Sequence, residues 1–101
     1  MTPTAKNILI IMSDEHRKDA MGVAGHPIVK TPHLDALAAR GTVFENAYTP
    51  SPMCVPTRAS VATGDHVHKT RNWDSATPYD GTPRSWMRHL RDQGIVTTSI
   101  G

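Results

Sequence analysis

The stretch NILIIMSDEH, residues 7–16, decides the predicted fold of this chain. Five consecutive apolar residues, 8–12, are typical of a strand that is buried on both faces of a parallel sheet. Asp14 and Glu15 come just after this run, at the carboxyl end of the predicted strand. In open α/β sheets, ligands bind in the crevice outside the carboxyl ends of the strands. Two adjacent acids at this edge indicate a ligand site, although an ordinary solvated loop is the alternative.

Helix signals follow in three places. In TPHLDALAARG, residues 31–41, Thr31 is placed to cap a helix that starts at Pro32 and stops at Gly41. A second short helix is predicted over residues 57–64. A third is predicted within residues 82–94, with Thr82 as its cap and Gly94 as its end.

Two further strands are predicted between and after these helices, over residues 42–48 and 95–100. The order is then strand, helix, strand, helix, helix, strand. This order predicts an α/β fold with a mostly parallel sheet and flanking helices. The last strand runs into the final residue, so we expect residues 1–101 to be the first portion of a larger domain.

Composition excludes some classes of function. The 101 residues have room for one small domain, and 38% hydrophobic residues with eight prolines is a loop-rich composition. The 11 basic and 9 acidic residues leave a net charge of only +2. No basic run or nucleic-acid motif accompanies this charge, so we expect no nucleic-acid partner.

Cysteine usage and hydropathy bear on location. A single cysteine cannot form an internal disulfide, so nothing indicates an oxidising compartment. The apolar run 8–12 is shorter than the roughly 20 residues of a membrane span and the roughly 7–15 of a signal-peptide core. We therefore expect a cytoplasmic protein without a membrane partner, unless a leader precedes the chain.

The single cysteine lies in SPMCVPTRASVATG, residues 51–64. A lone cysteine is more often a small buried apolar residue than a nucleophile. Cys54, however, lies between prolines and just before a predicted helix, whose N-terminal N–H groups favour anions. Arg58 is one turn further on and carries a forked charge that suits sulfate or phosphate oxygens. This context favours a nucleophile that handles an anion.

The stretch CVPTR, residues 54–58, matches the C-x-P-x-R core of the type I sulfatases, and ASVATG follows it as expected. NILIIMSDEH and TPHLDALAARG match two further motifs of that family in the same order. The chain thus resembles the N-terminal portion of a sulfatase catalytic domain of the alkaline phosphatase superfamily over most of residues 7–101. NWDSATPYDGTPRSW, residues 72–86, is similar to a choline-sulfatase-like branch.

The resemblance implies a specific chemistry. In that family the motif cysteine, here Cys54, is oxidised by a formylglycine-generating enzyme to Cα-formylglycine (3-oxoalanine), whose hydrate is the nucleophile. It implies that Asp14, Glu15 and the modified Cys54 hold a divalent cation, usually Ca²⁺ and in some branches Mn²⁺ or Mg²⁺. It also implies that Arg58 holds the formylglycine and offsets developing charge. Glu15 is longer than the family's usual second acid.

The implied function is that of a sulfuric ester hydrolase acting on a small organic sulfate ester. A phosphonate or phosphate ester hydrolase of the same superfamily remains open, as does a non-catalytic truncated fragment. The family's further metal ligands and catalytic His and Lys lie beyond the motifs present here. We therefore expect the 101 residues alone to be inactive, and leave the oligomeric state open.

Two remaining features are weaker indications of function. Thr57 stands where the family commonly has Ser, a change that keeps the hydroxyl. His66 and His68 alternate in DHVHK, so a zinc site with Asp65 is conceivable. Because the two histidines have no third ligand or outer partners to orient them, solvated loop histidines are the default.

Overall fold

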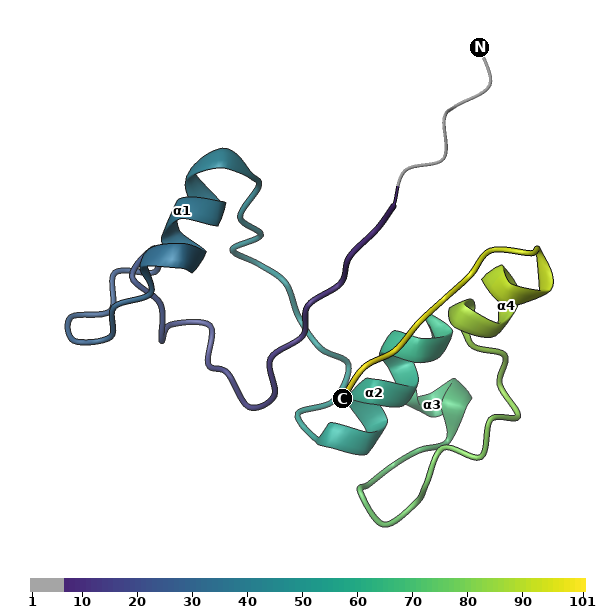
Figure 1. Ribbon diagram of the computed structural model, residues 1–101. Coiled ribbons are helices and arrows are strands. Elements are labelled where there is room, and N and C mark those ends of the chain that lie inside the picture. Colours follow the sequence, from purple (N-terminus) through teal and green to yellow (C-terminus); the bar gives the residue numbers. More distant parts are fainter. Residues whose placement is uncertain (1–6) are drawn as a thin grey trace. The chain divides into compact units, whose positions relative to one another are not determined.

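The computed structural model describes residues 7–101, which fall into two compact units divided between Glu45 and Asn46 (Figure 1). The first unit, residues 7–45, contains the helix α1 (Pro32–Arg40). The second unit, residues 46–101, contains α2 (Cys54–Thr63), α3 (Val67–Thr70) and α4 (Trp86–Asp92). None of the helices in residues 7–101 is long and apolar enough to span a membrane.

The predicted α/β fold with a mostly parallel sheet is wrong for this structure. Residues 7–101 contain helices, turns and irregular segments but no strand, and the three predicted strands at 8–12, 42–48 and 95–100 are irregular. Ile8 and Ile11 are each 85% exposed. A strand satisfies its backbone only by pairing with a neighbour, whereas a helix closes its own hydrogen bonds. The apolar pattern was therefore not sufficient to predict a sheet.

Helix α1 has the predicted bounds, with Pro32 as its first residue and Gly41 just after its last. Thr31 is the cap residue, as predicted, and its carbonyl accepts from the Asp35 N–H at 2.9 Å, but its side chain makes no capping hydrogen bond. Its hydroxyl instead accepts from the Gly22 N–H (2.8 Å) and donates to Asp35 Oδ1 (2.9 Å). The same carboxylate oxygen accepts from the Val23 N–H at 2.8 Å, so this cluster fastens the preceding loop to α1.

Helix α2 is the element on which the second unit is built, and α3 and α4 both pack against it. It starts at Cys54, three residues earlier than predicted, and ends at Thr63 before Gly64, as expected. Gly64 has φ 75°, a left-handed conformation that favours glycine, and its N–H donates to the Ser60 carbonyl at 2.8 Å. The Trp86 indole N–H of α4 donates to the Val61 carbonyl of α2 at 3.0 Å.

The start of α4 differs from the prediction. Its cap is Ser85, whose hydroxyl accepts from the Arg88 N–H at 3.2 Å, and not Thr82. Thr82 belongs to a preceding turn, in which its N–H donates to Asp80 Oδ1 at 2.8 Å. A cap must directly precede the first helical residue, and that residue is Trp86. Gly94 follows the end of the helix, as predicted.

Candidate active site at the start of α2

Cys54 is the first residue of α2 and its thiol is free and exposed. The N–H groups of Cys54 and Val55 have no acceptor inside a helix that starts here, and Pro56 has no N–H. An exposed side chain at this position therefore lies next to uncommitted helical N–H groups and the positive end of the helix dipole. Both features favour an anionic group beside residue 54.

Arg58 is exposed and lies one turn beyond Cys54 on α2. Residues four apart on a helix share a face, so the guanidinium and the side chain of residue 54 project from the same side. Pro56 and Ala59 are buried on the opposite side, with Ala59 only 1% exposed. The packing of α2 thus leaves the face with the cysteine and the arginine open to solvent.

Asp14 and Glu15 are also exposed, and they lie in the first unit, whereas Cys54 and Arg58 lie in the second. Glu15 has φ 51°, a left-handed conformation that is uncommon for a residue with a side chain. The structure describes each unit by itself, so the contact between these acids and residue 54 stays a prediction.

The two acids are suitable ligands for a divalent cation, but two residues are too few to complete its coordination. Carboxylate oxygens are the ligands that Ca²⁺ and Mg²⁺ prefer, and calcium takes roughly six to eight of them. Among residues 7–101, no three His, Cys, Asp or Glu side chains gather in a way that could hold a metal ion. Asp14 and Glu15 can therefore supply part of a coordination shell, and other oxygens would have to complete it.

The histidines of the DHVHK stretch do not gather around a site with Asp65. The rings of His66 and His68 stack, with centroids 5.8 Å apart and planes 12° from parallel. Asp65 is paired with Lys69, whose Nζ lies 3.1 Å from Oδ1. The two histidine rings thus contact each other and do not converge on a metal site with Asp65.

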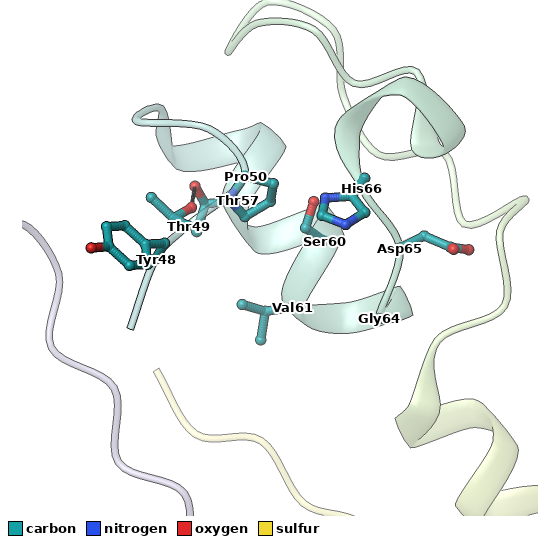
Figure 2. A pocket seen from close by; sticks show the side chains of 9 residues that line it. All are labelled: Tyr48, Thr49, Pro50, Thr57, Ser60, Val61, Gly64, Asp65 and His66. Carbon is teal, nitrogen blue, oxygen red and sulfur yellow. Dashed lines mark hydrogen bonds between the residues drawn. The ribbon is translucent and has the colours of Figure 1, made fainter. Parts of the chain in front are cut away.

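A group of hydroxyls that the sequence reading missed fastens the turn before α2. Thr57 Oγ1 donates to the Ser51 carbonyl at 2.6 Å, Thr49 Oγ1 donates to the same oxygen at 2.7 Å, and the two hydroxyl oxygens lie 2.9 Å apart. Figure 2 shows Thr49 and Thr57 side by side. Hydroxyl residues beside a proline-rich turn often bond to the nearby backbone, which is the signal that could have predicted this group.

A cavity of about 290 Å³ lies beside the same helix, and neither Cys54 nor Arg58 lines it (Figure 2). Its lining is mostly apolar and comes from the turn before α2, from α2 itself and from the residues after it. The residues that line it are Tyr48, Thr49, Pro50, Thr57, Ser60, Val61, Gly64, Asp65 and His66. The cavity is therefore distinct from the exposed face of Cys54 and Arg58.

The comparison with known families bears directly on this cysteine motif. The Sulfatase family model matches residues 6–101, nearly the whole chain. The chain belongs to the sulfatase family. This confirms the family that the motifs around Cys54 indicated.

Individual sulfatases are similar over most of the chain. An arylsulfatase K of Danio rerio is 36% identical over 95 residues, which are 94% of this chain and 18% of that protein. A choline-sulfatase of Rhizobium meliloti is 38% identical over 101 residues, 100% of this chain and 20% of that protein. An ulvan-active sulfatase of Formosa agariphila is 52% identical over 64 residues, 63% of this chain and 12% of that protein.

The chain spans at most 20% of the length of these three relatives. No solved structure matches it significantly. Both an arylsulfatase K and a choline-sulfatase match nearly all of its residues, so similarity extends to more than one kind of sulfatase.

Proposed function

We propose that these residues belong to the catalytic domain of a sulfuric ester hydrolase that acts on an organic sulfate ester through formylglycine at position 54. The observation that carries this proposal is the placement of Cys54 as the exposed first residue of α2, with Arg58 one turn further on the same helix. A formylglycine-generating enzyme would be the partner that modifies Cys54. The similarity to several sulfatases supports sulfate over phosphonate as the substrate group.

The chemistry of position 54 depends on its modification. A hydrated aldehyde supplies two hydroxyls on one carbon, one to take the sulfuryl group from the ester oxygen and one to expel sulfate as the aldehyde returns. Exposure of residue 54 admits the ester. The N–H groups at the start of α2 would donate to sulfate oxygens, and the Arg58 guanidinium would stabilise the negative charge that develops on them.

A divalent cation is the second requirement. Asp14 and Glu15 would hold Ca²⁺, Mn²⁺ or Mg²⁺, with further oxygens completing the shell. Such a cation polarises the sulfate oxygens and favours ionisation of an adjacent hydroxyl. The task of these two residues is then to present carboxylate oxygens from an exposed turn, where Glu15 has φ 51°.

The proposal is tested in the full-length parent protein. Mass spectrometry of the peptide around Cys54 should show a loss of about 18 Da, the conversion of a thiol to an aldehyde. Cys54→Ala should lower aryl sulfate turnover by roughly 10³-fold or more, because it removes the nucleophile. His89→Ala is a matched control on the exposed part of α4 and should leave turnover unchanged.

Two results would contradict the proposal. One is full aryl sulfate turnover by a protein whose Cys54 is an unmodified thiol. The other is a preference for a phosphonate monoester over an aryl sulfate when both are compared as kcat/KM, which would place the protein in the phosphonate branch of the superfamily.

A further inference from the structure

Helix α2 begins without a side-chain cap. Its cap residue is Met53, in extended conformation with φ −118° and ψ 148°, and no side-chain hydrogen bond is made there. Methionine has no side-chain oxygen that could accept from the first N–H groups. Residue 54 is thus placed on a helix start that depends on other contacts for its order.

The hydroxyls of Thr49 and Thr57 supply such contacts. The Thr57 hydroxyl donates to the Ser51 carbonyl at 2.6 Å, which closes a loop from residue 51 to residue 57. The Thr57 N–H also donates to the Met53 carbonyl at 3.0 Å. Cys54 lies inside the loop 51–57 that the Thr57 side chain closes and inside the shorter turn 53–57 that its backbone closes.

The network is partly buried, since Thr49 is exposed and Thr57 is half-buried. Ser51 is 7% exposed and Pro56 is fully buried. The Ser51 carbonyl accepts from both hydroxyls, so loss of the Thr57 hydroxyl would remove one of the two donors to an oxygen of a buried residue. Both hydroxyls donate to the Ser51 carbonyl and their oxygens lie 2.9 Å apart, so removing either hydroxyl alters the surroundings of the other.

We infer that the Thr57 hydroxyl, through this Thr49–Ser51–Thr57 network, is a positioning group that sets the orientation of residue 54 for reaction. The inference rests on the proposed function, because it matters only if residue 54 carries the nucleophile. Without the hydroxyl, the turn 49–51 is released from α2 and the uncapped first turn frays. Catalysis is sensitive to displacements of about 1 Å at the reacting atom.

The test uses the full-length parent and normalises activity to the fraction of residue 54 that mass spectrometry shows as formylglycine. This normalisation is needed because Thr57 is three residues from the residue to be modified, so its replacement could also change the extent of modification. Thr57→Val keeps the shape of the side chain and removes the hydroxyl, and it should lower kcat per modified site by roughly 10- to 100-fold. KM should change little, because Thr57 does not face the substrate in this assignment.

Thr57→Ser is the matched control, since it restores the hydroxyl, and it should keep kcat near that of the parent. Thr49→Val should also lower kcat, although Thr49 lies outside α2. It serves as the second variant if Thr57→Val does not fold. The double variant should be no worse than Thr57→Val alone, because the three groups act together.

Equal kcat per modified site in the parent, Thr57→Val and Thr49→Val would overturn the inference, even if the variants melt at a lower temperature. That result leaves the proposed function intact. An unmodified Cys54 or absent sulfate ester turnover in the parent would contradict both.

Discussion

At the scale of single residues, the candidate site is defined by what α2 leaves exposed. Cys54 and Arg58 face solvent while Ala59 and Ser60 are buried, so the same ten residues provide both the packing of the second unit and the exposed face of the candidate site. The cysteine could be recognised from its motif. Its place as first residue of the helix, and the hydroxyls that hold the preceding turn, could be seen only in the structure.

Arg58 gives a prediction at this scale. Arg58→Lys keeps the positive charge but replaces a planar fork that can donate two parallel hydrogen bonds by a single ammonium group. We expect kcat/KM for an aryl sulfate to fall by roughly 10- to 100-fold in the full-length parent. Steady-state kinetics measure this, with Arg88→Lys on the exposed part of α4 as the matched control.

An Arg58→Lys variant with unchanged kcat/KM would show that charge alone is sufficient at this position. It would remove the forked hydrogen bonding from the proposed role of Arg58.

At the scale of elements, short polar turns do much of the ordering between the helices of the second unit. Asn72 is 4% exposed and its Nδ2 donates to the Thr77 carbonyl at 3.1 Å. Asp74 Oδ1 accepts from the Thr77 hydroxyl and from the Thr77 N–H, both at 2.8 Å. The segment between α3 and α4 contains no helix or strand, and these side-chain hydrogen bonds hold it in a turn.

The turn at Asp74 is predicted to depend on pH. Hydrogen bonds from the Thr77 hydroxyl and then from the Thr77 N–H hold the pKa of Asp74 below its ordinary value of 3.8. A carboxyl whose pKa is lower in the folded state stabilises the fold above the unfolded pKa, and this contribution is lost as the pH falls through the folded pKa. The turn should therefore loosen only below pH 3.8.

Nuclear magnetic resonance of the Thr77 amide, followed as the pH is lowered, measures this transition. Asp74→Asn keeps an acceptor oxygen without a titrating group, and the transition should be absent in that variant. A midpoint at or above 3.8 in the parent would contradict the assigned hydrogen bonds.

At the scale of the whole molecule, the described residues bury little apolar surface. Ala59 is the one buried hydrophobic residue within residues 7–101, apart from the buried proline at 56. Large apolar side chains are exposed in both units, among them Ile8, Leu9 and Ile11 in the first and Val96 and Ile100 in the second. Exposed apolar segments of this kind favour association.

We therefore expect the 101-residue chain to bind a hydrophobic dye and to self-associate at micromolar concentration. Replacing Ile8 and Ile11 together by Lys should lower both dye fluorescence and the mass measured by light scattering. Asn7→Lys with Ser13→Lys is the matched control, which adds the same charge without removing apolar surface. If the unsubstituted 101-residue chain is monomeric and does not raise the dye fluorescence, this expectation is contradicted.

Local sequence was enough to predict the family and several of the helix ends. Pro32, Gly41 and Gly64 act through local backbone geometry, so the ends they predicted for α1 and α2 agree with the structure. The cysteine motif is equally local, and the family comparison confirms what it indicated.

The remaining features depend on contacts that form only in the folded chain. The apolar runs predicted strands, but strand formation depends on a partner distant in sequence, and no strand forms within residues 7–101. The cap of α4 is Ser85, while Thr82 bonds to Asp80 in the preceding turn. The hydroxyl of Thr57 bonds to the Ser51 carbonyl, six residues away along the chain. Helix ends can be read from neighbouring residues, whereas pairing and side-chain partners depend on which distant atoms folding brings together.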